Sequence, residues 1–441
     1  MKNLEKWKNK KDRKPLIIRG ARQTGKTVAI EIFAKNFENP VTLNLERDSD
    51  KSLFERSRSA DEAIKAIELY KGKTLSEKNT LLFIDEIQNS QNAIKFLRFF
   101  HEDRPDLFVI AAGSLLEAIM IQDGFSFPVG RVEFLYLHPL TFDEFLLASG
   151  KNKISEELLK ITPAEKPSAI LHKLASEAFN EYALVGGMPA VVADFIEKKS
   201  FQSAADIKEN LLTAIKDDVA KYARVAESKY LRHVIEYAPY YLGERVTYEK
   251  FGNSEYRSRE IKRSFELLEY AMVVQRVHGS YSTEPPIQPN FSVAPKLLYL
   301  DSGLAVHKLG LTQEAALTQD LNALFKGKLA EQIVGQSLMA RNPHQQIKPC
   351  FWYRNKPGST AEIDFSCQHQ NKILPIEVKS GKTGGLKSLH QFMLASPSDL
   401  AVRFYSGELA TDILKADKKT FKLLSVPFYL QWRLGELLEA L

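Results

Sequence analysis

The sequence predicts an α/β fold that opens with a parallel sheet, continues into a mainly helical region and closes with a small second α/β sheet. Short apolar runs alternate with helical periodicity up to about residue 150, helical spacing dominates over 155–225, and apolar and polar residues alternate over 361–380. Because 441 residues exceed one ordinary core, we expect several domains. Their expected boundaries are 1–150, 151–228, 229–310 and 311–441.

The composition is that of a soluble globular protein, with 44% hydrophobic and 26% charged residues. Two cysteines, Cys350 and Cys367, exclude a disulfide framework. No apolar run reaches bilayer length and the start MKNLEKWKNKKDRK lacks a signal-peptide core, so we expect a cytoplasmic protein without a membrane partner. The net charge of +6 permits nucleic-acid binding without requiring it.

A phosphate-binding loop is the strongest signal, within PLIIRGARQTGKTVAIEIFAKNF. The spacing predicts a buried strand over 15–19 and a helix over 27–37. Between them lies GxxxxGKT, a P-loop whose backbone N–H groups cradle phosphates at a helix N-terminus. We expect ATP to bind there, with Lys26 on its β- and γ-phosphates and Thr27 on Mg²⁺. The residues of this loop are Gly20, Ala21, Arg22, Gln23, Thr24, Gly25, Lys26 and Thr27.

A pair of acids at the end of an apolar strand completes the expected chemistry. A strand at VTLNLERD is followed by TLLFIDEIQ, which ends in Asp85 and Glu86 and has the form of a Walker B strand. We expect Asp85 to hold the Mg²⁺ water shell and Glu86 to polarise the attacking water. A glutamate directly after the aspartate favours hydrolysis over binding alone.

Several stretches together resemble one family, namely the AAA-like P-loop ATPases that carry a C-terminal domain of unknown function. The stretches are GARQTGKT, LFIDEIQ, GSLLE, GRVEFLYLHPLTFDEF and VGGMP. The resemblance implies that Ser114, at the end of the strand LFVIAAGS, senses the γ-phosphate. It also implies that Arg131 acts as a finger on a neighbouring subunit's nucleotide, which requires a homo-oligomer. The alternative for Arg131 is a surface arginine beside a hairpin.

The middle of the chain gives weaker signals. Gly186 and Gly187 in VGGMP fit a tight turn and close packing better than a second phosphate site. From 229 to 279, three helical stretches run into a strand, which is typical of a winged helix. Its last helix carries an apolar stripe at Ile261, Phe265 and Leu268. The basic residues Arg257, Arg259, Lys262 and Arg263 lie off that stripe. They indicate contact with DNA, although a lid, a protein contact or a solvated face has the same pattern.

The stretch AEIDFSCQHQNKILPIEVKS predicts a hairpin that turns between residues 370 and 371. In that register Asp364 faces Glu377, and Glu362 faces Lys379, all on the face opposite the apolar residues. Two carboxylates directly across an antiparallel pair repel each other. A cation between them would remove that cost.

A helix containing Glu331, followed by strands bearing Asp364 and Glu377-x-Lys379, resembles the PD-(D/E)XK nuclease superfamily. The resemblance implies that Glu331, Asp364 and Glu377 bind Mg²⁺ and that Lys379 orients the attacking water. Three alternatives stay open: an ordinary ion pair between Glu362 and Lys379, a one-residue slip that reverses the faces, and a related domain that only binds.

Together these signals predict an ATP-binding, Mg²⁺-dependent ATPase whose nucleotide state regulates a nuclease-like C-terminal domain acting on DNA. One alternative is an ATP-gated module that binds DNA or a partner protein without cutting. Another is a nucleotide-dependent signalling switch that engages only proteins.

Overall fold

The computed structural model describes residues 1–75, 79–114, 128, 130–221, 225–310, 327–345, 347–379, 381 and 385–441. The chain divides into two compact units. The N-terminal unit is mainly Met1–His138, and the C-terminal unit comprises Pro139–Glu269, Val273–Arg341 and Ile347–Leu441. Across the described ranges, no helix combines the length and the apolar character that crossing a membrane demands.

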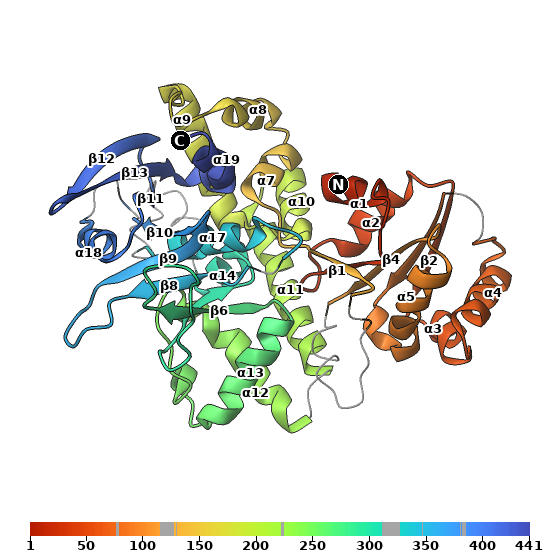
Figure 1. Ribbon diagram of the computed structural model, residues 1–441. Helices are drawn as coiled ribbons and strands as arrows, with labels where there is room; N and C mark the ends of the chain where they lie inside the picture. Colours follow the sequence, from red (N-terminus) through yellow and green to blue (C-terminus); the bar gives the residue numbers. More distant parts are fainter. Residues whose placement is uncertain are drawn as a thin grey trace. The chain divides into compact units, whose positions relative to one another are not determined.

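The N-terminal unit is a five-stranded sheet whose strand pairs are all parallel, in the order β2-β3-β4-β1-β5 (Figure 1). Its strands are β1 (Leu16–Arg19), β2 (Asn39–Asn44), β3 (Thr80–Asp85), β4 (Phe108–Gly113) and β5 (Glu133–Tyr136). Its helices are α1 (Lys2–Lys8), α2 (Lys26–Ala34), α3 (Asp48–Glu55), α4 (Ala60–Lys71), η1 (Ile87–Asn89) and α5 (Gln91–Asp103). The strand, helix and acidic-strand order is the one that the sequence predicts.

Helices cover both faces of this sheet, which explains why β1 and β3 are buried along their whole length. One core packs Phe54, Ile64 and Ile94, from α3, α4 and α5, against the sheet. A second core packs Trp7 of α1 and Phe33 of α2 against the other face of the sheet. The sheet is therefore the middle one of three layers, and the side chains of the candidate site lie where its strands end.

The C-terminal unit begins with helices. They are α7 (Phe142–Ala148), α8 (Asn152–Lys160), α9 (Ala169–Val185), α10 (Pro189–Lys198), α11 (Phe201–Lys221), α12 (Val225–Tyr237), η2 (Ala238–Tyr241), η3 (Phe251–Asn253) and α13 (Ser258–Tyr270). Local signals set their ends, because Thr141 and Glu144 form a capping box at α7 and Pro189 opens α10. The apolar stripe predicted on α13 is confirmed, since Ile261, Phe265 and Leu268 are all buried.

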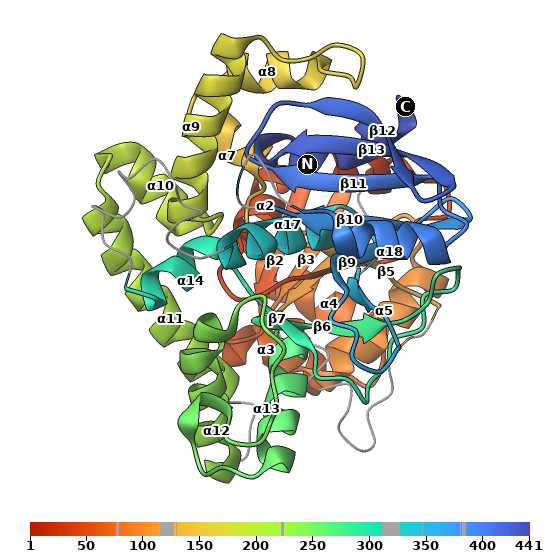
Figure 2. The ribbon, with the colours of Figure 1, turned by 90° about the vertical axis from the view of Figure 1, so that its left-hand side faces the viewer.

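A mixed eight-stranded sheet follows, in the order β12-β13-β11-β10-β9-β8-β6-β7 (Figure 2). Its strands are β6 (Val274–Ser280), β7 (Lys296–Tyr299), β8 (Cys350–Tyr353), β9 (Glu362–His369), β10 (Lys372–Val378), β11 (Leu400–Tyr405), β12 (Ala410–Ala416) and β13 (Lys419–Pro427). The associated helices are α14 (Ser302–Lys308), α17 (Lys328–Ala340), α18 (Lys387–Ala395), η4 (Phe428–Arg433) and α19 (Leu434–Glu439).

Two features of this sheet depart from the sequence-based expectation. The strand β12 was not predicted; it pairs with β13 through a turn in which Asp417 has a positive φ of 51°. In the region predicted as a winged helix, β6 and β7 form an antiparallel pair, but both strands belong to the eight-stranded sheet, since β6 also runs parallel to β8. The winged-helix assignment therefore stays a prediction.

The predicted hairpin register is confirmed, because Phe365 pairs with Ile376 and His369 with Lys372. On the other side of β9 the register shifts by one. Cys350 pairs with Ser366 while Trp352 pairs with Ile363, so two residues of β9 stand opposite Phe351 alone. Such a bulge re-aims side chains and is common beside functional sites. It lies at Asp364 and Phe365, within the stretch that carries the acids.

The glycines of VGGMP serve close packing, as the sequence predicted. Asp301 is fully buried and its carboxylate accepts hydrogen bonds from the backbone N–H groups of Gly187 (2.7 Å) and Leu304 (3.0 Å). Gly186 has a φ of +83°, and a Cβ at that position would lie 2.1 Å from Oδ1 of Asp301. The turn between α9 and α10 is thereby fixed to the start of α14.

Candidate functional site

The phosphate loop joins β1 to α2 and has the backbone shape that an anion site requires. Gln23 and Gly25 have positive φ angles of 62° and 91°, and left-handed residues of this kind are typical of backbone loops that bind anions. Gly25 caps the N-terminus of α2. Lys26 is buried, and its ammonium group donates to the carbonyls of Gly20 (3.0 Å) and Ala21 (2.8 Å). The loop is thus held closed by its own lysine.

Thr27 and Asp85 meet at the sheet edge. The Thr27 hydroxyl donates to Oδ2 of Asp85 across 2.8 Å, although 58 residues separate them. Both side chains carry oxygen atoms, which are the ligands that Mg²⁺ prefers. The two predicted metal-holding groups of the N-terminal unit are therefore brought together.

Glu86 follows at a strained position, with a positive φ of 51° just beyond β3. Burial raises the pKa of its carboxyl above the ordinary value, and the charge of Asp85 raises it further, whereas hydrogen bonding from Gln88 and the charge of Lys26 oppose the shift. A carboxylate with a raised pKa is a better proton acceptor near neutral pH, which suits a group that activates water.

Gln88 is a residue that the sequence reading missed. Its amide donates a short hydrogen bond to Oε2 of Glu86. Gly113, at the end of β4, makes room for it, because a Cβ there would lie 2.3 Å from Oε1 of Gln88. The available signal was an amide side chain two positions after the acid pair.

Ser114 directly follows β4, and its role as a sensor of the γ-phosphate stays a prediction. The strand order inserts β4 between β1 and β3, so its end falls between the phosphate loop and the acid pair. The Ser114 hydroxyl is buried and has no hydrogen-bond partner among the described residues. A buried, unsatisfied hydroxyl at this position fits a phosphate oxygen as its partner.

Arg131 lies just before β5, where its guanidinium pairs with Oε1 of Glu102 across 2.8 Å. The side chain is 46% exposed. Arg98 contacts the same carboxylate from the preceding helical turn, at 3.1 Å. Arg131 is therefore not gathered with the other nucleotide-site residues, and its predicted role on a neighbouring subunit stays a prediction.

The residues of the N-terminal site fit ATP and Mg²⁺. The loop offers backbone N–H groups at the N-terminus of α2 and a buried ammonium group. Thr27 and Asp85 offer adjacent oxygens, and Ser114 offers a hydroxyl without a partner among the described residues. Thr27 and Asp85 would hold the cation, and Lys26 would turn from the loop carbonyls to the phosphates.

The second candidate site is a group of acids in the C-terminal unit, which we call the acid cluster. It contains Glu331 of α17, Glu362 and Asp364 of β9, and Glu377 of β10. The structure brings the predicted acids together but adds a residue that the sequence reading missed. Lys296, the first residue of β7, contacts Glu362 at 2.7 Å, Glu331 at 3.2 Å and Asp364 at 3.4 Å.

The charged residues of the hairpin take other partners than one of the alternatives left open by the sequence. Lys379 contacts Oε1 of Glu377 at 2.5 Å, whereas Glu362 pairs with Lys296 and with Arg245 at 2.7 Å. The ordinary ion pair between Glu362 and Lys379, which the sequence left open as an alternative, is absent from the described contacts of both residues. The bulge in β9 explains the change, because it breaks the alternation from which that pair was inferred.

Burial has the largest influence on the pKa of two of these acids. It raises the pKa of Glu331 to about 8 and that of Glu377 to about 7, and the charge of Asp364 acts in the same direction on both. The positive charge of Lys296 lowers both values in part.

The acid cluster does not fit a divalent metal ion in this arrangement. Within the described ranges, no three His, Cys, Asp or Glu side chains are set to hold one. The carboxylates instead surround an ammonium group. We therefore derive no chemical step through a metal ion in the C-terminal unit.

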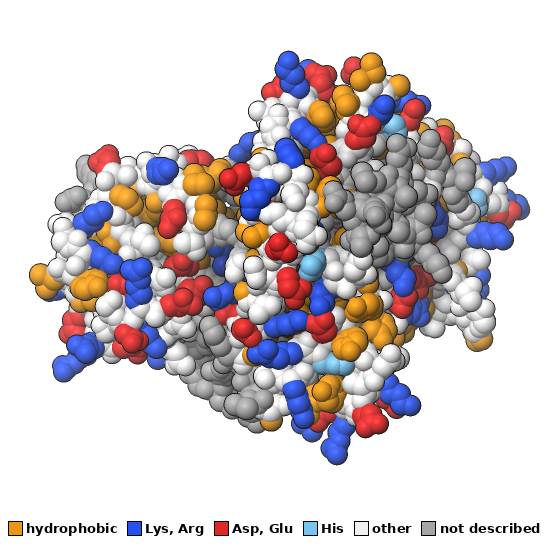
Figure 3. Space-filling model, turned by 180° about the vertical axis from the view of Figure 1, so that it is seen from behind, with side chains coloured by type: hydrophobic (Ala, Val, Ile, Leu, Met, Phe, Trp, Pro, Cys, Tyr) orange, Lys and Arg blue, Asp and Glu red, His pale blue; other side chains and the backbone are white. Residues whose placement is uncertain are grey.

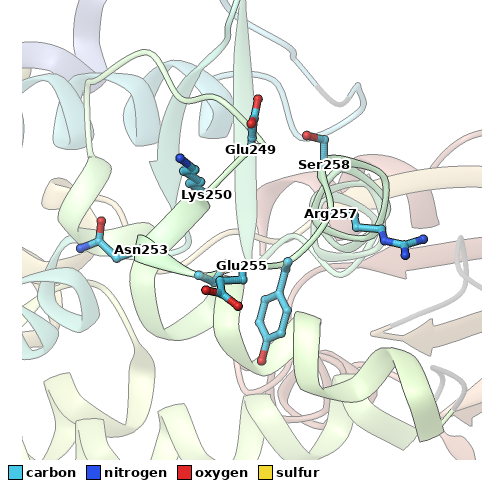
Figure 4. Close-up of a pocket in the computed structure, with 8 residues that line it drawn as sticks. Glu249, Lys250, Asn253, Glu255, Arg257 and Ser258 are labelled. Carbon is cyan, nitrogen blue, oxygen red and sulfur yellow. The ribbon is translucent and has the colours of Figure 1, made fainter.

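A third feature is the exposed basic face of α13 and a pocket of about 580 Å³ at its start. Figure 4 shows Lys250 and Asn253 on one side of this pocket and Arg257 and Ser258 on the other. Arg259 and Lys262 are exposed on the same helix. Figure 3 shows basic and acidic side chains interspersed on the face drawn there, so no extended field of one sign appears on it.

Comparisons with known proteins agree with the N-terminal site. Residues 12–146 match the family model described as AAA domain, residues 176–315 match Domain of unknown function (DUF8612), and residues 326–429 match Domain of unknown function (DUF4143). Residues 12–146 of the N-terminal unit are thus similar to an AAA domain. No curated protein matches the chain.

Solved structures of low sequence identity also align with the chain. The Walker-type ATPase PABY2304 of Pyrococcus abyssi is 14% identical, with a TM-score of 0.44 over 70% of this chain and 94% of that one. The ORC2 protein of Aeropyrum pernix, an ADPNP-ADP complex, is 11% identical, with a TM-score of 0.33 over 62% and 84%. The ORC1 protein of Aeropyrum pernix, in complex with DNA, is 12% identical, with a TM-score of 0.30 over 72% and 89%.

Proposed function

We propose that this chain is an ATP-binding, Mg²⁺-dependent ATPase whose nucleotide state regulates a nuclease-like C-terminal unit acting on DNA. The observation that carries the proposal is the convergence of Lys26, Thr27, Asp85 and Glu86 at one edge of the N-terminal sheet. A P-loop without an acid pair would support nucleotide binding alone. The glutamate beside the metal-holding aspartate supports turnover.

The chain's own groups account for the steps of hydrolysis. The loop N–H groups and Lys26 would position the β- and γ-phosphates, and Thr27 and Asp85 would hold Mg²⁺, which neutralises phosphate charge when bound. Glu86 would accept the proton of the attacking water, with Gln88 fixing the orientation of its carboxylate. Ser114 would donate to a γ-phosphate oxygen and report whether that phosphate is present.

The decisive experiment measures ATP hydrolysis by the full chain with and without DNA, using wild type and Glu86→Gln. We expect DNA to change the rate of ATP hydrolysis by wild type. We expect Glu86→Gln to bind ATP normally but to hydrolyse it at least about 100-fold more slowly, because the variant lacks the general base. Normal hydrolysis by Glu86→Gln contradicts its role. A wild-type rate that is indifferent to DNA contradicts the partner and leaves the ATPase intact.

DNA is proposed as the partner because α13 presents exposed basic side chains beside a pocket. Arg257, Arg259 and Lys262 are exposed at or near the N-terminal end of this helix. Backbone phosphates supply most of the affinity in sequence-independent DNA binding, and they require such side chains.

A second candidate is an ATP-gated module that binds DNA or a partner protein without cutting. The specific observation that favours it is Lys296 among the carboxylates of the acid cluster. Plasmid incubated with Mg²⁺ or Mn²⁺ separates the two, with Asp364→Ala as the comparison. Nicking by wild type that Asp364→Ala loses supports a nuclease; equal nicking by both, or none, supports the binding module.

A further inference from the structure

Lys296 is buried within the acid cluster and is tightly engaged there. Its side chain is 7% exposed, and its ammonium group lies within 3.4 Å of oxygen atoms from Glu331, Glu362 and Asp364. An ammonium group has three N–H donors, and three carboxylates surround it. A buried lysine without such partners would lose its proton, but here the three carboxylates outweigh burial and raise the pKa of Lys296.

The oxygens that a divalent cation would use are largely engaged. Oε1 of Glu362 contacts the ammonium group of Lys296, and its Oε2 contacts the guanidinium group of Arg245. Asp364 gives Oδ1 to Lys296, and its Oδ2 accepts a hydrogen bond of 2.8 Å from the backbone N–H of Val378. Mg²⁺ needs about six oxygen ligands at roughly 2.0–2.1 Å, and a second cation that close to an ammonium group would be strongly repelled.

The fold holds Lys296 in this position through its backbone. The segment around Arg245 runs beside the start of β7, where the N–H of Val246 donates to the carbonyl of Pro295 at 2.9 Å. The N–H of Gly243 donates to the carbonyl of Leu297 at 3.2 Å. The residues on both sides of Lys296 are thus held by backbone hydrogen bonds. The backbone at this edge of the sheet therefore keeps the ammonium group of Lys296 beside the acids.

Charge is nearly balanced without a metal ion. Four carboxylates face the cations Lys296, Lys379 and Arg245. Burial raises the pKa of Glu331 above its ordinary value, whereas the charge of Lys296 opposes that shift. Oε2 of Glu377 is buried and has no hydrogen-bond partner among the described residues, so it is an available ligand if the ammonium is removed.

We infer that Lys296 is the built-in cation of the acid cluster and takes the position that a divalent metal ion would otherwise hold. This inference rests on the nuclease-like part of the proposed function and is independent of ATP hydrolysis. Its consequence is that the C-terminal unit keeps the acids of a metal site while excluding the metal.

The test titrates nucleotide-free full-length chain with Mn²⁺ alone and follows free Mn²⁺ by electron paramagnetic resonance. Every variant carries Asp85→Asn, which removes the N-terminal cation ligand. We expect no Mn²⁺ site with Lys296 present, a new site in Lys296→Met, and its loss again in Lys296→Met/Glu331→Gln. Lys308→Met is the matched control, because Lys308 is another largely buried lysine, paired with Glu236 in the same unit. It should gain no site.

A folded Lys296→Met chain without a new site overturns the inference. If Lys296→Met does not fold, the comparison of the Lys296-containing chain with Glu331→Gln decides. Mn²⁺ binding that Glu331→Gln abolishes shows a metal ion beside Lys296 and overturns the inference, whereas no difference between the two supports it. ATP binding is measured on the corresponding chains with intact Asp85, so that a failure of the N-terminal proposal is seen separately.

Discussion

The hydroxyl of Thr27 donates a hydrogen bond to Oδ2 of Asp85 across 2.8 Å, and it thereby joins the phosphate loop to the end of β3. Lys26 stands beside this pair with its ammonium on the loop carbonyls. These contacts place a cation and two oxygen ligands around one small volume. A substitution in any of the three should therefore act first on nucleotide binding.

Replacing Lys26 should weaken nucleotide binding strongly. We expect Lys26→Ala to weaken ATP binding by roughly 100-fold, since hydrogen bonds to charged groups contribute about 1.5–3 kcal/mol. Isothermal titration calorimetry measures the change. Lys35→Ala is the control, because Lys35 is an exposed lysine at the other end of the same helix. Wild-type affinity in Lys26→Ala contradicts the site.

The pH dependence of turnover should report on Glu86. Because burial raises its pKa, the carboxyl takes up a proton at a higher pH than the ordinary 4.5, and kcat/KM should fall on acidification with a midpoint above that value. Gln88→Leu should move the midpoint higher still, since hydrogen bonding from Gln88 lowers the pKa. Exposed Gln91 supplies the control, Gln91→Leu. If Gln88→Leu leaves the midpoint of the pH profile unchanged, the hydrogen bond from Gln88 does not set the pKa of Glu86.

If Arg131 is an arginine finger, it should stimulate hydrolysis only of the nucleotide bound to a neighbouring subunit. Titrating wild-type chain with Arg131→Ala should then lower ATPase activity per wild-type chain, because each variant subunit deprives its neighbour of a cation. Arg98→Ala is the matched control, since Arg98 binds the same carboxylate of Glu102. Equal effects of the two variants would assign Arg131 to that surface ion pair alone.

The basic face of α13 should set the salt dependence of DNA binding. We expect Arg259→Ala/Lys262→Ala to weaken binding and to reduce the slope of log K against log salt by about 1 for every DNA phosphate that the variant no longer neutralises. Fluorescence anisotropy over a range of salt concentrations measures it. The control replaces two exposed lysines elsewhere in the unit, Lys153 and Lys173, by alanine. Unchanged slopes in both variants place the DNA-binding surface elsewhere.

The turn at VGGMP should be intolerant of a side chain. Gly186→Ala should destabilise the C-terminal unit by about 3 kcal/mol or more, combining left-handed strain with a clash against Asp301. Gly150→Ala is matched, because Gly150 also has a positive φ of 70° but nothing within 4 Å of the added Cβ. It should cost about 1–2 kcal/mol. Urea unfolding measures both, and equal costs would remove the role given to Asp301.

The nucleotide site could be predicted from sequence because its residues are contiguous and each type is dictated locally. Glycine is needed for positive φ at position 25, a lysine follows it, and a hydroxyl comes next. The hairpin register was equally local, since the turn fixes the pairing of Phe365 with Ile376. Features of this kind need no knowledge of the rest of the fold.

The acid cluster could be predicted only in part, because its remaining features depend on distant partners. The bulge at Asp364 and Phe365 exists against β8, and the alternation of Ile363 and Phe365 in the sequence gives no sign of it. Lys296 lies far from the acids in the chain, at the start of an apolar strand after a proline-rich stretch. A lysine that opens a fully buried strand was the available signal.

The edge of the eight-stranded sheet at β7 is occupied by groups that are not strands. The side-chain amide of Gln332 accepts from the N–H of Tyr299 at 2.8 Å and donates to its carbonyl at 2.7 Å, imitating a neighbouring peptide. The carbonyl of Leu297 accepts from Gly243. Strand addition by another molecule is therefore blocked at these peptide groups. At the opposite margin β12 exposes Ile413, and self-association through the sheet would have to start there.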